Sequence, residues 1–131
     1  MHKVLIVDDQ PEIRRLLNFT LRDEFDVIEA ADGESALAML EAHDVRLVLL
    51  DVMMPGAIDG LGVLDIVKGS PQRTHVPVAM LTARGQVIDF EEARARGADA
   101  YFTKPFSPME VHQWVRDRLS GTPSPRDFTP P

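Results

Sequence analysis

Short apolar runs recur along the chain, and a polar residue follows each of them. The clearest runs occupy residues 4–7, 47–50, 78–81 and 100–103. Runs of this length, bounded by polar residues, are typical of strands that are buried on both faces, as in parallel sheets. Residues 25–29 form a further short strand-like segment. We therefore predict five strands.

Helical patterns separate these segments. Pro11 suits the first turn of a helix, and the apolar residues after it recur at the spacing of an amphipathic helix. Further helices are expected at residues 34–42, at about 61–69, at 87–96 before Gly97, and at 108–119 after Ser107 as N-cap. Alternating strands and helices, joined by right-handed crossovers, predict an α/β fold. We expect a doubly wound, five-stranded parallel sheet in a three-layer (βα)5 sandwich.

The composition fits one globular domain. The chain has 131 residues, of which 44% are hydrophobic, enough for one core and too few for two domains of ordinary size. We assign residues 1–119 to this domain. Residues 120–131 are rich in Pro, Ser, Thr and Gly. Such a segment buries too little apolar surface to offset its ordering entropy, so we expect a flexible tail or linker there.

Charge and cysteine content argue against several kinds of function. The formal net charge is −7, and Lys and Arg do not cluster, which argues against direct contact with nucleic acid. The chain has no cysteine, so disulfides, thiolate zinc sites and cysteine nucleophiles are excluded. No apolar stretch approaches the roughly 18 residues of a membrane span, and the first residues do not resemble a signal peptide. We expect a cytoplasmic protein without membrane contact.

The residues at the ends of the predicted strands carry the candidate chemistry. Asp8 and Asp9 follow residues 4–7, and Asp51 follows the most apolar run. Thr82 and Lys104 follow the last two runs. Ligands bind beyond the carboxyl ends of strands in an open parallel sheet, so these side chains are expected to converge. Carboxylate oxygens without His or Cys suit Mg²⁺ or Mn²⁺.

Asp51 is the candidate nucleophile. A carboxylate can attack phosphorus and form an acyl phosphate. Lys104 could neutralise the phosphoryl group or pair with Asp51 in its absence, and Thr82 and the Ala83 N–H could donate hydrogen bonds to it. Each of these residues also has an ordinary interpretation, as a helix cap, a turn residue or a surface lysine. Pro105 makes the Lys104–Pro105 bond a candidate cis peptide.

Taken together, these motifs resemble the receiver domain of bacterial two-component response regulators. The matching segments are VLIVDD at residues 4–9, LLDVMMP at 49–55, LTA at 81–83 and GADAYFTKPF at 97–106. The resemblance covers residues 3 to about 119. It implies the flavodoxin-like strand order 2-1-3-4-5.

The resemblance also implies a role for each residue. Asp51 would accept a phosphoryl group from the phosphohistidine of a sensor histidine kinase or a phosphotransfer protein. Asp9, the Asp51 carboxylate and the backbone carbonyl of Met53 would bind Mg²⁺, with Asp8 acting through water. The protein would then be a signalling switch and not an enzyme that turns over a substrate.

The output side of the switch follows from the same resemblance. Thr82 and Lys104 would bind the phosphoryl oxygens. Tyr101 matches the switch aromatic of the family, which turns inward as Thr82 moves toward the phosphoryl group. The face formed by the fourth helix, fifth strand and fifth helix would then change shape and meet a downstream protein or domain. The sequence leaves open whether phosphorylation also produces a homodimer.

The loop after Asp51 departs from the family pattern. The segment 55–60 is one residue longer than usual, which bears on the shape of the loop and on access to the pocket. Met53 and Arg84, each two positions beyond a site residue, flank the pocket in this family. A bulky Met and a long Arg predict slow attack by water and a phosphoryl lifetime of minutes or longer.

Some residues also fit other functions. A phosphatase or phosphotransferase of the haloacid dehalogenase type would need a second acid two residues after its aspartyl nucleophile, where Met53 follows Asp51. A degenerate receiver that only binds a partner is opposed by the complete set of site residues. The segment 60–62 matches only part of a dinucleotide fingerprint. Phe90 and Trp114 either pack in the core or, if exposed, mark a partner surface.

Overall fold

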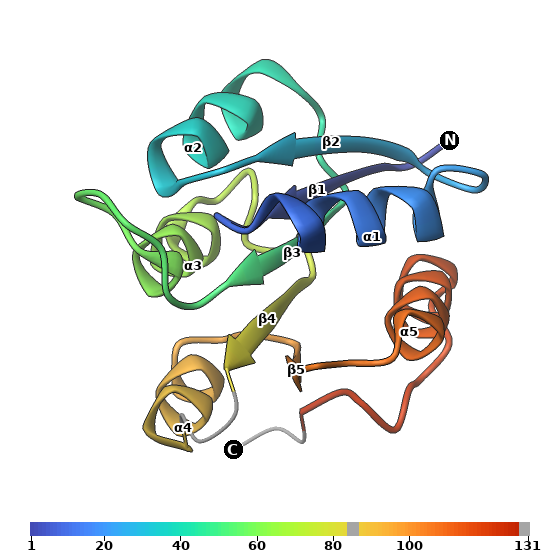
Figure 1. The fold of residues 1–131 in the computed structure, drawn as a ribbon. Coiled ribbons are helices and arrows are strands. Elements are labelled where there is room, and N and C mark those ends of the chain that lie inside the picture. Colours follow the sequence, from blue (N-terminus) through green and yellow to red (C-terminus); the bar gives the residue numbers. More distant parts are fainter. Residues whose placement is uncertain (84–86, 129–131) are drawn as a thin grey trace.

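The computed structural model describes residues 1–83 and 87–128, with only the backbone of residues 87–89 (Figure 1). Strands and helices alternate throughout. The strands are β1 (Lys3–Val7), β2 (Asp26–Ala30), β3 (Leu47–Asp51), β4 (Val78–Ala83) and β5 (Ala100–Lys104). The helices are α1 (Pro11–Leu21), α2 (Gly33–Ala42), α3 (Gly60–Gly69), α4 (Val87–Ala95) and α5 (Pro108–Ser120).

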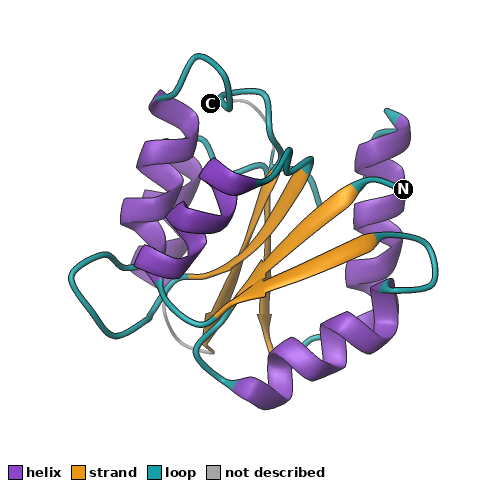
Figure 2. Cartoon of the chain, turned by 90° about the horizontal axis from the view of Figure 1, so that it is seen from above, coloured by secondary structure: helices purple, strands orange, loops and turns teal. Residues whose placement is uncertain are grey.

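The five strands form one parallel sheet in the order β2-β1-β3-β4-β5. Helices α1 and α5 cover one face, and α2, α3 and α4 cover the other (Figures 1 and 2). The predicted fold class and strand order are confirmed. The fold is the flavodoxin-like doubly wound sandwich.

Two hydrophobic cores lie on the two faces of the sheet. Successive side chains of a strand point to opposite faces, so Leu5 and Val7 pack in one core and Val4 and Ile6 in the other. All four side chains are fully buried. This arrangement explains why the strands are continuous apolar runs and do not alternate with polar residues.

The helix ends follow the predicted chemistry, with small shifts in the bounds. Pro11 stands in the first turn of α1, and the Ser107 side chain accepts a hydrogen bond from the Glu110 amide at the start of α5. Gly97 has φ +100° just after α4, a conformation that glycine adopts without steric cost. The second strand begins at Asp26, one residue later than expected, although Phe25 is buried beside it.

The segment after α5 folds back onto the domain. Gly121, with φ +81°, ends the helix in the left-handed conformation. Asp127 forms an isolated antiparallel bridge with Ala100, and the Phe128 amide donates to the Asp99 carbonyl at 2.9 Å. Residues 121–128 of the expected flexible tail therefore lie against β5 and α5 in this structure.

The length and apolarity of the helices bear on membrane insertion. None of the helices in the described part of the chain is both long and apolar enough to cross a bilayer.

Candidate functional site

The register of the sheet brings three carboxylates together. Asp8 follows β1 and Asp51 ends β3, and these strands are neighbours in which Val7 pairs with Leu50. One carboxylate oxygen from each of Asp8, Asp9 and Asp51 lies within 4.8 Å of the others. The convergence predicted from the strand ends is confirmed for these three acids.

Asp8 is held by the start of α1. Its side chain is fully buried, and its Oδ1 accepts a hydrogen bond of 2.9 Å from the Gln10 amide. Its backbone carbonyl accepts a hydrogen bond of 2.7 Å from Arg14. Its other carboxylate oxygen, Oδ2, has no hydrogen-bond donor among the described residues. A buried carboxylate oxygen left in this state is costly unless a cation lies nearby.

Lys104 supplies a cation. It ends β5, and its Nζ lies 2.8 Å from Asp8 Oδ2 and 3.5 Å from Asp51 Oδ2. The contact with Asp8 Oδ2 is an ion pair, and Nζ also donates a hydrogen bond of 2.9 Å to Gln10 Oε1. Three carboxylates thus face one ammonium within the part of the chain that the structure describes.

The charge imbalance shows in Asp51. Burial and, after it, the neighbouring Asp8 carboxylate together raise the pKa of Asp51 from 3.8 to about 7, although Lys104 acts in the opposite direction. The Asp51 residue is only 4% exposed. The Met53 amide donates to Asp51 Oδ1 at 3.3 Å and helps to orient the carboxyl group. A carboxyl in this environment favours a bound cation, which would restore its charged form.

The remaining predicted residues lie at the same edge of the sheet. Thr82 is buried near the end of β4 and pairs with Thr103 in β5. Ala83 is exposed and pairs with Lys104. Met53 is 59% exposed in the loop after β3. The Lys104–Pro105 bond is cis, as predicted.

Three aromatic residues, Tyr101, Phe90 and Trp114, are candidates for the switch or for a partner surface. Tyr101 is half-buried, and its hydroxyl accepts a hydrogen bond of 3.1 Å from Thr103. Trp114 is 1% exposed and packs against Phe102, so it is a core residue and not an exposed partner surface. Phe90 is half-buried. Arg84 lies outside the described residues.

The β3–α3 loop is fixed by contacts that the sequence analysis missed. A Cβ at Gly60 would lie 1.9 Å from the Asp51 carbonyl oxygen, so only glycine fits against the strand there. The Gly60 amide donates to the Val52 carbonyl at 3.0 Å. The Ala57 amide donates to Glu34 Oε1 at 3.3 Å, which ties the loop to α2. Gly60 was noticed in the sequence only as part of an incomplete dinucleotide fingerprint.

Gln10 and Arg14 were also missed. Gln10 bonds to both Asp8 and Lys104, and Arg14 bonds to the Asp8 carbonyl and to Glu29 at 3.1 Å. Gln10 is the N-cap of α1 and Arg14 lies in its first turns, which places both beside the strand ends. The only available signal was their nearness to the Asp pair, which many surface residues share.

The donor set fits a hard divalent cation. The cluster offers carboxylate oxygens without nitrogen or sulfur, which are the ligands that Mg²⁺ and Mn²⁺ prefer. Three carboxylates share one ammonium among the described residues, and the raised pKa of Asp51 reflects this excess of negative charge and its burial. The acidic cluster is therefore a candidate divalent-metal site.

Comparison with known proteins accounts for this arrangement. The model of the response regulator receiver domain matches residues 4–116. The chain belongs to this family. The predicted identity is thereby confirmed, and the family is one of signalling proteins and not an enzyme family.

Curated relatives include full-length regulators. The chain is 42% identical over 124 residues to the probable transcriptional regulator ycf27 of Cyanophora paradoxa, covering 94% of this chain and 50% of that protein. It is 43% identical over 115 residues to the alkaline phosphatase synthesis transcriptional regulatory protein PhoP of Bacillus subtilis, covering 87% of this chain and 47% of that protein. The receiver chain thus spans about half the length of these relatives.

Solved structures share the fold. A putative response regulator from Chloroflexus aurantiacus superposes with a TM-score of 0.85 at 34% identity, covering 91% of this chain and 98% of that one. The chemotaxis protein CheY4 of Vibrio cholerae superposes with a TM-score of 0.81 at 33% identity, covering 88% and 97%. The acidic cluster of this receiver is consistent with the phosphorylation site of such regulators.

Proposed function

We propose that Asp51 accepts a phosphoryl group from the phosphohistidine of a partner histidine kinase or phosphotransfer protein. The observation that carries this proposal is the meeting of the three carboxylates with Lys104 at one edge of the sheet. An Asp51 oxygen forms a bond to phosphorus as the bond from phosphorus to the donor imidazole nitrogen breaks. The product is an acyl phosphate on the receiver.

A divalent cation is part of this proposal. Asp9, Asp51 and the Met53 carbonyl would hold Mg²⁺ or Mn²⁺, with Asp8 acting through water. The bound cation supplies positive charge that neutralises the phosphoryl oxygens and keeps the Asp51 carboxyl ionised. The oxygen-only donor set and the presence of three carboxylates around one ammonium support this assignment.

The residues around Asp51 would bind the transferred group. In the structure Lys104 pairs with Asp8 and Asp51, and in the phosphorylated protein its ammonium would instead contact a phosphoryl oxygen. The Thr82 hydroxyl and the Ala83 amide would donate to the other oxygens. Thr82 lies on β4, next to both β3 and β5, a position that suits this role.

The same group would drive the switch. As Thr82 moves toward the phosphoryl oxygens, Tyr101 on the neighbouring strand turns inward, and the face made by α4, β5 and α5 changes shape. A downstream domain or protein would bind that face. The transcriptional regulators among the relatives support an output of this kind.

Intact mass spectrometry tests the proposal. The wild-type chain is incubated with acetyl phosphate, with and without Mg²⁺, and compared with Asp51→Asn and with Asp23→Asn, a control at an exposed aspartate. We expect the mass of one phosphoryl group to be added to wild type and Asp23→Asn only when Mg²⁺ is present. Equal uptake by Asp51→Asn, or no uptake by wild type, would contradict the proposal and favour a receiver that only binds partners.

A further inference from the structure

The segment 121–128 lies across one end of the face that the proposed function assigns to output. It leaves α5 at Gly121 and returns along α5 toward β5. β5 is an edge strand of the sheet, and the bridge between Ala100 and Asp127 covers part of its open edge. Backbone pairing to an exposed edge is a common way for an extended segment to dock.

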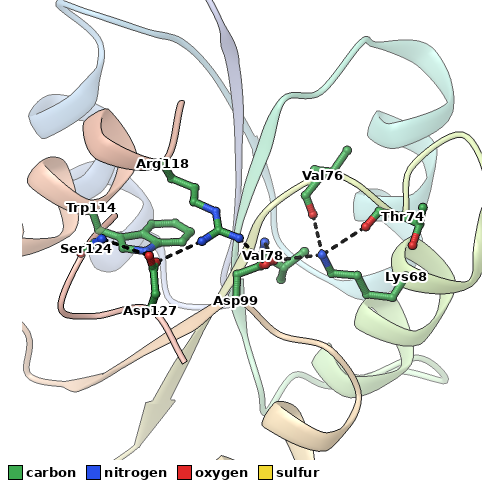
Figure 3. A network of polar contacts seen from close by, with 9 residues as sticks. All are labelled: Lys68, Thr74, Val76, Val78, Asp99, Trp114, Arg118, Ser124 and Asp127. Carbon is green, nitrogen blue, oxygen red and sulfur yellow. Dashed lines mark hydrogen bonds and ion pairs between the residues drawn. The ribbon is translucent and has the colours of Figure 1, made fainter. Parts of the chain in front are cut away.

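Asp127 is the polar anchor of this segment. Its Oδ1 accepts a hydrogen bond of 2.8 Å from the Trp114 indole nitrogen and lies 3.2 Å from Arg118 Nη1 (Figure 3). Its Oδ2 accepts a bond of 3.0 Å from the Ser124 amide. Arg118 also contacts Asp99, so the anchor joins a larger polar network (Figure 3).

Phe128 is the apolar anchor. Its ring stacks on Tyr101 with centroids 6.0 Å apart and an interplanar angle of 18°. It also meets Phe90 of α4 edge-to-face at 5.1 Å, and Phe90 meets Tyr101 at 4.3 Å. Phe128 thus completes a three-ring cluster around the proposed switch aromatic.

The contacts of the docked segment are concentrated in two residues. Its middle residues, Pro123 to Arg126, are mostly exposed, and its specific contacts come largely from Asp127 and Phe128. The Arg126–Glu110 ion pair lies at the surface, where such pairs add little. Segments with few buried contacts open at low free-energy cost.

We propose that residues 121–128, which follow α5, form a latch that covers Tyr101 and the adjoining part of α4, β5 and α5 until Asp51 is phosphorylated. This inference rests on the proposed function. When Tyr101 turns inward, Phe128 loses the ring on which it stacks, and the latch is released. Because coupling between two sites is reciprocal, removing the latch must also favour the activated form.

The docked state can be observed through Trp114. The chain has one tryptophan, so its indole N–H gives a single side-chain peak in a ¹H–¹⁵N spectrum. Asp127→Ala removes the hydrogen-bond acceptor and marks the peak position of the undocked segment. Phe128→Ala leaves that acceptor in place, so a shift of its indole peak toward the Asp127→Ala position reports undocking of the whole segment. Phe19→Ala, at an exposed ring on α1, is the control and leaves the peak unchanged.

Activation is tested on the 131-residue chain with Mg²⁺ and beryllofluoride. We expect the wild-type indole peak to move toward the Asp127→Ala position, and Phe128→Ala to need about fivefold less beryllofluoride for half-saturation, the lower end of usual allosteric coupling. An unmoved peak in Phe128→Ala would show that the segment does not dock as a unit. An unmoved wild-type peak on activation, or an unchanged half-saturation in Phe128→Ala, would show that docking is not coupled to the switch.

The latch and the phosphorylation proposal can fail separately. The comparison of wild type with Phe128→Ala needs no activator, so it tests docking even if the mass experiment shows no phosphoryl uptake. Uptake on Asp51 with a static indole peak would reject the latch alone.

Discussion

Aspartates lie at both ends of the parallel strands, which we call the carboxyl edge and the amino edge of the sheet, but their surroundings differ. At the carboxyl edge, Asp8, Asp9 and Asp51 share Lys104, and Asp8 Oδ2 lacks a hydrogen-bond donor among the described residues. At the amino edge, just before β5, both oxygens of Asp99 are satisfied (Figure 3). The first cluster has an excess of negative charge, and the second does not.

The negative charge of the Asp99 carboxylate is compensated by its partners. Its Oδ2 accepts bonds of 2.9 Å from Lys68 Nζ and 2.8 Å from the Val78 amide, and its Oδ1 accepts one of 2.7 Å from Arg118. Its side chain is 17% exposed, similar to that of Lys68 at 16%. A balanced cluster of this kind holds elements together, whereas an unbalanced one is prepared for a ligand.

The largest expected effect is at the balanced edge. Asp99→Ala leaves Lys68 and the Val78 amide without their shared acceptor, so we expect the free energy of unfolding to fall by about 3 kcal/mol. Chemical denaturation measures this loss. Asp65→Ala, which removes only a surface contact with Arg96, is the control and changes stability by about 0.5 kcal/mol or less. Similar losses in the two variants would remove the basis of the comparison.

At the unbalanced edge, removing the charge of Asp51 is expected to raise the free energy of unfolding. The Asp51 carboxyl has a higher pKa when folded, about 7, than its ordinary value of 3.8, so the folded state binds more protons between these values. The free energy of unfolding of the metal-free protein therefore falls as pH rises from about 4 to about 7 and stays level above. Asp51→Asn removes this penalty.

Denaturation at two pH values measures this gain. The rise in pKa from 3.8 to about 7 is about three tenfold changes in the acid constant, each worth about 1.4 kcal/mol. We expect Asp51→Asn to recover about half of this penalty, about 2 kcal/mol, at pH about 8 without divalent cations, because Lys104 also loses a charged partner. At pH about 4 the difference should vanish. A destabilising Asp51→Asn at the higher pH would show that the charge at this edge is compensated after all.

Mg²⁺ should have a smaller effect, and at one edge only. Ten times its dissociation constant stabilises a folded protein by about 1.4 kcal/mol through mass action. We expect a rise of that size in wild type, measured by denaturation with increasing MgCl₂ and with NaCl at matched ionic strength. Asp51→Asn should lose most of the rise and Asp65→Ala none. Equal stabilisation of all three proteins would indicate a general salt effect.

The smallest effect is expected at an exposed pair outside both clusters. Lys3 Nζ lies 2.8 Å from Asp26 Oδ2, and the Asp26 side chain is 49% exposed. Lys3→Met should change the free energy of unfolding by about 0.5 kcal/mol or less. A loss as large as that of Asp99→Ala would mean that the exposure of an ion pair does not indicate how much it stabilises this protein.

Much of this molecule was predictable because its local signals agree. Continuous apolar strands, Pro11 and Ser107 at helix starts, and Gly97 after α4 all report short-range chemistry, and the structure follows them. The acidic cluster was predictable because parallel register aligns the strand ends. The contacts of Gln10 and Glu34 were not, since they depend on how side chains from separate elements meet.

The C-terminal segment shows the limit of composition as a guide. A stretch rich in Pro and Ser indicates disorder on average, but two residues in it, Asp127 and Phe128, find specific partners on β5 and α5. Those partners lie outside the segment, from nearby Trp114 in α5 to Tyr101 in β5. No local pattern in residues 120–131 could have identified them.

The β3–α3 loop has a consequence for protein engineering. The hydrogen bond from the Gly60 amide to the Val52 carbonyl closes the loop at its base, so the residues between them form an appendage outside the sheet. Lengthening a closed loop costs little, about 0.6 kcal/mol for each doubling of its length. If segment 55–60 carries one residue more than the family pattern, as the resemblance predicts, that insertion is of this inexpensive kind. The exposed turn near Gly56 is therefore a suitable place to insert a peptide tag or a fluorescent reporter near Asp51.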